Sequence, residues 1–195
     1  MAAPSKLNFK IYQGSTFAEV LRWESSTKVY KPITAITIAA PVVITAASHG
    51  IPVGWRTKVT NVVGMTQINS SDVYQIVTAA DTNTVTLNAV NSLGYTAYTS
   101  GGVLEYNQPV SLSGVTARMQ IRDKVTSTTY IDELTTENGK IVVDDALKTI
   151  TILLSAAVTA AYTFTTAVYS LETISGTVVT PLIYGSITLD KEITR

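Results

Sequence analysis

Charged residues are distributed unevenly along this chain, and their distribution constrains the fold more than any other feature. Between residues 34 and 106 the only charged side chains are Arg56, Lys58, Asp72, Asp81 and Glu105. The flanking segments carry all the others, several of them as adjacent pairs. A composition that changes at both ends of a central block is expected where one domain interrupts another. We therefore predict a discontinuous domain, 1–33 plus 107–195, with an inserted module at 34–106.

The composition predicts an all-β protein. Threonine, valine and isoleucine are frequent, and the 10 tyrosines far outnumber the 3 phenylalanines. Branched and aromatic side chains suit the pleated, half-buried surface of a sheet. Hydrophobic residues make up 46% of the chain, which is enough for globular cores. Only 14% are charged, against roughly 25% in a typical soluble domain, and such a surface favours contact with neighbouring proteins.

Charge, cysteine content and hydropathy exclude several classes of partner and chemistry. The formal net charge is zero, so no basic field attracts phosphate backbones and no nucleic-acid partner is expected. The absence of cysteine excludes disulfides, thiolate nucleophiles and cysteine-based zinc sites. The longest apolar stretch, 35–47, contains Pro41 and falls short of the roughly 20 residues that span a bilayer. The first residues lack an apolar core, so neither a signal peptide nor a membrane partner is expected.

Periodicity predicts many short strands and one helix. The clearest alternation lies in 115–123, where Val115, Ala117, Met119 and Ile121 share one face. Segment 25–32 is expected to be a loop or a short edge, and 155–162 a short helix with Ser155 as N-cap. The other predicted strands cover 6–12, 16–24, 33–40, 41–47, 57–63, 73–80, 84–90, 103–106, 128–136, 140–145, 148–155, 167–174 and 178–189. About seven strands fall in the flanks, which is the number in an immunoglobulin-like sandwich.

Residues with catalytic or metal-binding chemistry are few and poorly placed for it. His49, the only histidine, lies in a Ser-His-Gly turn, where a structural or solvent-exposed role is expected instead of a triad or a metal site. The adjacent pairs Asp132–Glu133 and Asp144–Asp145 resemble solvated turn residues, because catalytic carboxylates face each other across a cleft. No calcium loop, phosphate-binding glycine loop or nucleophile elbow is present. We therefore predict no enzyme activity and no catalytic, cofactor-binding or metal-binding residues.

Four aromatic residues of the central block are candidates for contact with another protein. They are Trp55, Tyr95, Tyr98 and Tyr106. Aromatic side chains with a polar tip are enriched in protein interfaces. A sugar-stacking platform is a second interpretation, but sugar sites usually add charged or amide groups beside the ring, and charge is nearly absent here. Ordinary packing in the core and loops is the remaining alternative.

Two stretches resemble parts of bacteriophage proteins. The central block has the segments PVVITAASHG, VVGMTQIN, VTLNAV and GYTAYTSGG. It is similar to a module of phage tail and fibre proteins, a small β-barrel named after the first catalytic-cysteine half-domain of ubiquitin-activating enzymes. The flanks, with PVSLSGVTARMQIRD, TITILLSAAVTAAYTF and YGSITLDKEITR, resemble immunoglobulin-like domains of baseplate upper proteins and of neck or fibre-attachment proteins. Because this chain has no cysteine, ubiquitin chemistry does not carry over.

The resemblance implies a structural component of a tailed-phage virion, made in the bacterial cytoplasm and located at the tail or neck. Its expected partners are other virion proteins, namely tail, adaptor or fibre subunits, together with further copies of itself. No cofactor is expected. One alternative is a capsid decoration or head-fibre protein. The other is a carbohydrate-binding adhesin that recognises a host surface through the tyrosine-rich segment.

Overall fold

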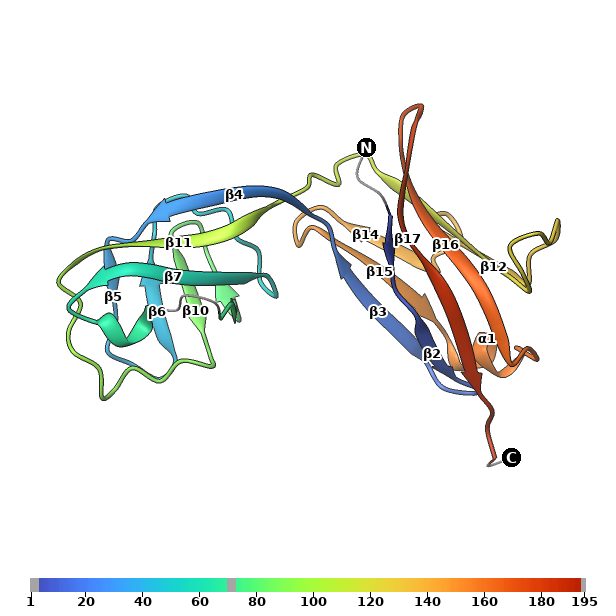
Figure 1. The fold of residues 1–195 in the computed structure, drawn as a ribbon, viewed down its shortest axis with the longest axis horizontal. Coiled ribbons are helices and arrows are strands. Elements are labelled where there is room, and N and C mark those ends of the chain that lie inside the picture. Colours follow the sequence, from blue (N-terminus) through green and yellow to red (C-terminus); the bar gives the residue numbers. More distant parts are fainter. Residues whose placement is uncertain (1–3, 70–72, 194–195) are drawn as a thin grey trace. The chain divides into compact units, whose positions relative to one another are not determined.

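The chain forms two compact units in the computed structural model, which describes residues 4–69 and 73–193 (Figure 1). Unit 1 comprises the described residues of Met1–Leu21, Leu112–Asp145 and Thr149–Arg195. Unit 2 comprises those of Arg22–Ser111 and Ala146–Lys148. Strands account for 52% of the chain and helices for 4%. The prediction of an all-β fold is therefore confirmed.

Unit 1 is a sandwich of two sheets. Its larger sheet contains β1 (Ser5–Lys6), β2 (Phe9–Tyr12), β12 (Thr116–Arg122), β13 (Asp132–Thr135), β16 (Thr166–Ser175) and β17 (Val178–Asp190). Its smaller sheet contains β3 (Phe17–Arg22), β14 (Ile141–Asp144) and β15 (Thr149–Leu154). A single short helix, α1 (Ala156–Ala160), connects β15 to β16.

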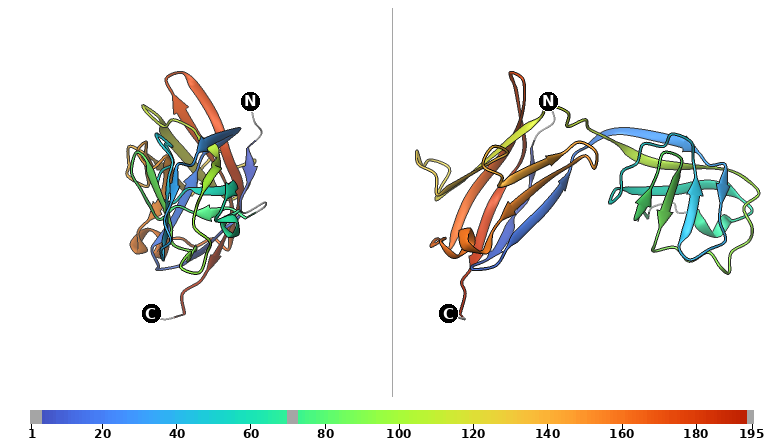
Figure 2. Two further views of the ribbon diagram at one scale, coloured as in Figure 1. Left: turned by 90° about the vertical axis from the view of Figure 1, so that its left-hand side faces the viewer. Right: turned by 180° about the vertical axis from the view of Figure 1, so that it is seen from behind.

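The strand order in unit 1 is that of an immunoglobulin-like sandwich. The larger sheet runs β1-β17-β16-β12-β13, with β2 also paired to β17, and the smaller sheet runs β14-β15-β3. In chain order these strands correspond to A (β1 and β2), B, C, C′, D, E, F and G, which divide between a G-F-C sheet and a B-E-D sheet. Figures 1 and 2 show β12, β16 and β17 side by side. The predicted immunoglobulin-like sandwich is therefore present in unit 1.

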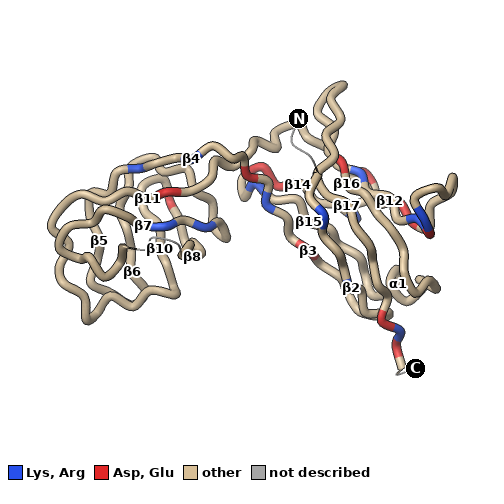
Figure 3. The backbone as a smooth tube through the Cα atoms, in the orientation of Figure 1, with Lys and Arg blue, Asp and Glu red and all other residues tan. Residues whose placement is uncertain are grey.

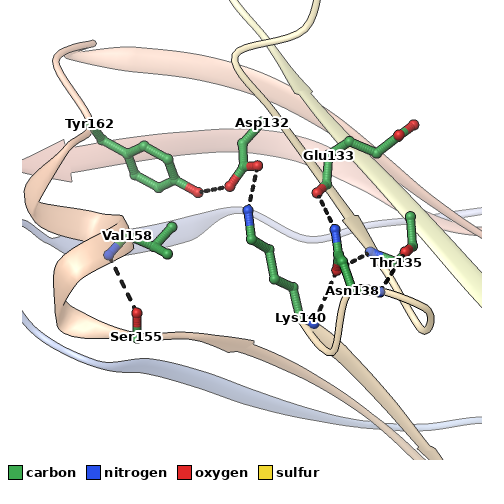
Figure 4. Close-up of polar contacts among 8 residues, drawn as sticks. All are labelled: Asp132, Glu133, Thr135, Asn138, Lys140, Ser155, Val158 and Tyr162. Carbon is green, nitrogen blue, oxygen red and sulfur yellow. Dashed lines mark hydrogen bonds and ion pairs between the residues drawn. The ribbon is translucent and has the colours of Figure 1, made fainter.

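Alternating side chains build the core of unit 1, as the sequence predicts for β12. Ala117, Met119 and Ile121 are each at most 1% exposed and face the smaller sheet. Ile150, Ile152 and Leu154 of β15 are buried on the opposite side. The predicted cap of the helix is also correct, because the backbone N–H of Val158 donates to the hydroxyl of Ser155 (Figure 4).

The N-terminal strand follows β17 in two pieces because its backbone passes very close to Gly185. A Cβ atom at position 185 would lie 1.9 Å from the carbonyl oxygen of Leu7, so only glycine fits there. The Leu7 oxygen accepts a hydrogen bond from the Tyr169 hydroxyl at 2.6 Å. The backbone N–H of Ser186 donates to the Asn8 side chain at 3.1 Å. These contacts separate β1 from β2 and fix the position of Lys6 in the sheet.

Unit 2 contains two four-stranded antiparallel sheets. One sheet, ordered β4-β11-β7-β8, is built from β4 (Glu24–Pro32), β7 (Arg56–Val63), β8 (Gln75–Ile76) and β11 (Ser100–Pro109). The other, ordered β5-β6-β10-β9, is built from β5 (Ala35–Ile36), β6 (Val42–Thr45), β9 (Ala79–Ala80) and β10 (Thr84–Leu87). A 3₁₀ helix, η1 (Thr66–Ile68), follows β7, and residues 70–72 of the loop expected there lie outside the described residues. Neither sheet closes into a barrel within the described part of the chain.

The division between the units falls at 21/22 and 111/112, whereas the charge distribution predicts 33/34 and 106/107. Pairing of β4 with β11 accounts for the difference, because register partners such as Lys31 and Leu104 join residues on either side of the predicted boundaries. Segment 25–32 is accordingly the edge strand of a sheet in unit 2, which is the second of the two expected alternatives, and not a loop. The larger segment of unit 2, Arg22–Ser111, still lies along the chain between β3 and β12 of unit 1.

The charges in the sheet strands of unit 2 lie in one of its two sheets, and Asp81 lies in the turn between β9 and β10 of the other. The strands β5, β6, β9 and β10 contain no charged residue. Lys28, Arg56, Lys58 and Glu105 all lie in the other sheet (Figure 3). The two outer faces of unit 2 therefore differ in chemistry, one being rich in Thr, Val and Ala and the other carrying ion pairs.

Candidate interaction surfaces

Two of the four candidate contact residues, Trp55 and Tyr106, are core side chains of unit 2. Trp55 is 1% exposed and Tyr106 is 3% exposed. The indole N–H of Trp55 donates to the carbonyl oxygen of Leu147 at 2.8 Å. The Tyr106 hydroxyl donates to the carbonyl oxygen of His49, and burial raises the pKa of this phenol. Neither ring is available to a partner protein, so ordinary core packing is the correct description of both.

The other two candidates, Tyr95 and Tyr98, are half-buried and pack against the same core. The Tyr98 hydroxyl donates to the carbonyl oxygens of Ile33 and Gly101, each at 3.0 Å, and so fixes the end of the loop that leads into β11. Tyr95 lines a small hollow beside Gln67 and Gln75. The four rings therefore form no shared exposed platform, which removes the feature that a sugar-stacking site in this unit requires.

His49 has a structural role and is not solvent-exposed. The side chain is 1% exposed. Its Nδ1 atom accepts from the backbone N–H of Ile51 at 3.0 Å, and its Nε2 atom lies 3.0 Å from the carbonyl oxygen of Thr84. A carbonyl only accepts and a backbone N–H only donates, so Nε2 carries the single proton. The imidazole is therefore neutral and fully used in joining its turn to β10.

The adjacent carboxylates Asp132 and Glu133 point to opposite sides of β13 (Figure 4). Asp132 accepts from Lys140 Nζ at 2.6 Å and from the Tyr162 hydroxyl at 2.7 Å. The pKa of Tyr162 is raised, first by burial and then by this carboxylate. Glu133 instead accepts from Gln120 Nε2 at 2.6 Å on the outer face of the sheet. The two acids therefore cannot share a proton or a ligand.

The second acidic pair also has structural contacts, since Asp145 accepts from the backbone N–H of Leu112 at 2.6 Å. Within residues 4–69 and 73–193, no group of three or more His, Asp or Glu side chains is placed to hold a metal ion. The same residues include no helix with the length and apolar character that a membrane span requires.

Three cations and one carboxylate surround Tyr74 on the charged sheet of unit 2, and we call them the Tyr74 cluster. Lys28 Nζ, Arg56 Cζ and Lys58 Nζ lie 5.0, 5.5 and 5.7 Å from the centre of the Tyr74 ring. Glu105 lies 3.3 Å from both lysine Nζ atoms and accepts from the Tyr74 hydroxyl at 3.3 Å. Glu105 pairs with both lysines, and Arg56 pairs with Glu24. Because each cation already has a carboxylate partner, we expect the cluster to stabilise the outer face of the sheet.

Replacing Glu105 with glutamine is expected to make unit 2 less stable at neutral pH by about 1–3 kcal/mol, because both lysines and Tyr74 lose a charged acceptor. Burial alone would raise the pKa of Glu105, but hydrogen bonds and charge from Lys28 and Lys58 outweigh it and lower the pKa. A lowered carboxyl pKa contributes stability above the unfolded-state value, and this contribution is lost as the pH falls through the folded-state value. The difference in stability of unit 2 between wild type and E105Q should therefore narrow below about pH 5.

Thermal unfolding followed from neutral pH to about pH 3 measures this effect, and hydrogen exchange assigns it to unit 2. The Glu192→Gln variant removes the same charge from an exposed position after β17 and is expected to leave unit 2 unchanged. If the difference in thermal stability between wild type and E105Q stayed constant or widened as the pH fell, the assignment of the Glu105 carboxylate to the cluster would be contradicted.

The outer face of the larger sheet in unit 1 carries a row of five residues, one from each of the strands β13, β12, β16, β17 and β1. In register order the row is Glu133, Gln120, Ser170, Tyr184 and Lys6. Residues paired across strands point to the same side of a sheet, and the neighbours of the row, such as Met119, Leu134 and Leu171, are buried on the other side. We call this set the cross-strand row. It spans about 19 Å, or four strand spacings.

A hollow of about 590 Å³ lies over one part of this face. It forms because Ser170, Val168 and Ser186 in the middle of the sheet are short, whereas the side chains around them are long. Its lining includes Lys6, Gln120, Arg122, Val125, Tyr184 and Ser186. Val125 belongs to the loop between β12 and β13, which projects from the end of β12 in Figures 1 and 2, and it is 84% exposed.

Alternation in 115–123 places Gln120 and Arg122 on the outer side of their strand, and that signal is visible in the sequence. The sequence gives no sign that Lys6, Ser170 and Tyr184 join them, because strand order and register are needed to align segments so far apart. No protein-family model matches the chain, and no curated protein matches it either.

Proposed function

We propose that the chain is a non-catalytic structural component of a tailed-bacteriophage particle, and that it connects neighbouring tail, neck or fibre proteins through its two β units. The observation that carries the proposal is the placement of unit 2 between two strands of an immunoglobulin-like sandwich. A chain arranged in this way offers two separate sets of sheet faces and edges, which are the surfaces that β-domain contacts use. The resemblance of both parts to phage tail proteins supports the particle as its location.

The chemistry of the described side chains supports a binding role. His49, Asp132, Glu105 and Asp145 are all held in hydrogen bonds or ion pairs that stabilise the fold. The strands of one sheet in unit 2 form a surface of low charge density, and the face of unit 1 has a hollow. Such faces suit a protein that becomes covered during assembly.

Immunogold electron microscopy of purified phage particles, with antibody raised against this chain, tests the proposal. We expect label at the tail or neck, with a few to about a dozen copies per particle, as cyclic tail symmetry requires. Label distributed over the head would instead identify a decoration protein. Particles that carry no label while the chain remains in the lysate would contradict a structural role in the virion.

A further inference from the structure

We propose that the outer face of the larger sheet in unit 1 binds the same face of a second copy of this chain, forming a two-fold symmetric dimer. The evidence is the order of charges along the cross-strand row. The row begins with the cation Lys6 at the β1 edge and ends with the carboxylate Glu133 at the β13 edge. Ser170, its central residue, lies on the middle strand β16.

Such a row is complementary to itself under a two-fold rotation. Consider two copies of the sheet packed face to face about a two-fold axis that runs along β16. Each residue of the row then faces the residue of the second copy that lies equally far from Ser170 in the opposite direction along the row. Lys6 of one copy then faces Glu133 of the second, and Tyr184 faces Gln120. In a two-fold interface each such contact occurs twice, so the dimer contains two Lys6–Glu133 pairs.

The end residues of the row have charge to offer a partner. None of the ion pairs formed among the described residues includes Lys6 or Glu133. Glu133 accepts from the neutral amide of Gln120, and the charge of Arg118 also acts on it. The two arginines on this face have acceptors of their own. Arg118 is paired with Glu172 through its Nε atom at 3.1 Å, and the Arg122 guanidinium donates to Gln120 and to the carbonyl oxygen of Ser127.

Shape supports the same occupant. Around the centre of the row the outward side chains of β16 are short, namely Val168 and Ser170, so two faces can approach there to the spacing of about 10 Å that packed sheets adopt. The next outward residue, Glu172, would face Glu172 of the second copy, and Arg118 neutralises the charge of each. Tyr184 is 45% exposed and Val125 is 84% exposed, and both side chains would be removed from water in this arrangement. Because the loop that carries Val125 lies on the β12–β13 side, the rotation brings it over the β17 side of the other copy, where the hollow extends past Ser186.

Charge reversal tests the pairing directly. In sedimentation velocity over a wide range of concentration, the wild-type chain is expected to form dimers. Lys6→Glu and Glu133→Lys are each expected to weaken dimerisation by about tenfold or more, because each variant places like charges opposite one another twice. The double variant, which exchanges the charges, is expected to dimerise within about threefold of wild type.

Mixing the two single variants provides an independent test of the geometry. One copy with two carboxylates and one with two ammonium groups restore both opposite-charge contacts, so the mixture is expected to form heterodimers that neither variant forms alone. Lys191→Glu reverses an exposed charge outside the row and serves as the matched control, and circular dichroism establishes that each variant is folded. A wild-type chain that remains monomeric, or a double variant and a mixture that both stay as weak as the single variants, would overturn the dimer.

The inference concerns the multiple-copy character of the proposed function, but it rests on the sheet face alone. A monomeric chain that labels the tail in micrographs would remove the dimer and leave the proposed function standing. A chain that dimerises in solution but is absent from particles would leave the dimer standing and overturn the proposed function.

Discussion

Replacing Trp55 with alanine is expected to lower the free energy of unfolding of unit 2 by about 3–5 kcal/mol, which is the usual range for deleting a buried large aromatic side chain. Trp55 is 1% exposed and is among the largest fully buried side chains. It lies at the start of β7, and Val77 of the opposite segment donates to its carbonyl oxygen at 2.8 Å. Removing the indole ring would leave a cavity in the core between the two sheets of the unit.

Hydrogen exchange measured by mass spectrometry locates the effect. Exchange in β7, β10 and β11 is expected to accelerate, while that in β12, β16 and β17 stays at the wild-type rate because those strands have a core of their own. Trp55→Phe separates the two contributions of the residue. It retains a ring but removes the indole N–H that donates to Leu147, so a smaller loss of about 1–3 kcal/mol is expected.

The matched control for Trp55→Ala is Tyr30→Ala, which removes an aromatic ring from the same unit at a position 58% exposed. Surface substitutions of this kind usually change stability by less than about 0.5 kcal/mol. If the amide hydrogens of β7 exchanged as slowly in Trp55→Ala as in wild type, or if Tyr30→Ala accelerated their exchange equally, Trp55 would not be the centre of this core.

Elements defined by local patterns were predictable from the sequence. The strand β12 follows strict alternation, so the sequence predicts its buried face correctly and each of its limits to within one residue. The helix α1 begins after a serine with alanines inside, and the structure confirms Ser155 as its cap. Both signals depend only on residues next to one another, where period and capping chemistry act directly.

Elements defined by distant partners were not predictable. Residues 25–32 contain serine, threonine and lysine, which suggest a loop, and only pairing with β11 makes them the strand β4. Segment 73–80 was expected to be one strand. It instead forms β8 and β9, which belong to different sheets, with the fully buried Val77 between them. A change of sheet within one apolar segment leaves no periodic signal.

The candidate contact residues show the same limit. Trp55 and Tyr106 lie in a block with few charges, so residue type alone does not separate an interface from a core. Burial depends on which strands pack together, and here the two sheets of unit 2 enclose both rings. Conversely, Lys6 and Glu133 carry no local signal, and they become parts of one surface only when five strands from four parts of the sequence are aligned.

Joining Leu21 to Leu112 through a short Gly-Ser linker is expected to leave unit 1 folded. Its strands pair only with one another among the described residues, and its core draws on residues such as Ile11, Ile121 and Leu171, which are at most 1% exposed. The two joined positions lead into β3 and β12, which belong to facing sheets about 10 Å apart. The excised protein is expected to retain a near-UV circular dichroism spectrum and a cooperative thermal transition.

A second excision distinguishes the boundary set by strand pairing from the one set by composition. Removing only 34–106 leaves β4 and the end of β11 attached to the sandwich, but without β7, against which β11 also pairs. The remnant exposes Val29, which packs against the core of unit 2 in the intact chain, and an unpaired strand edge, so this variant is expected to aggregate more than the one cut at 21/112. If the 34–106 excision gave the more soluble and cooperative protein, β4 would belong with the sandwich. If both excisions lost near-UV signal while keeping their far-UV spectrum, unit 1 would depend on unit 2 for its packing, and the chain would be a single cooperative unit despite its two cores.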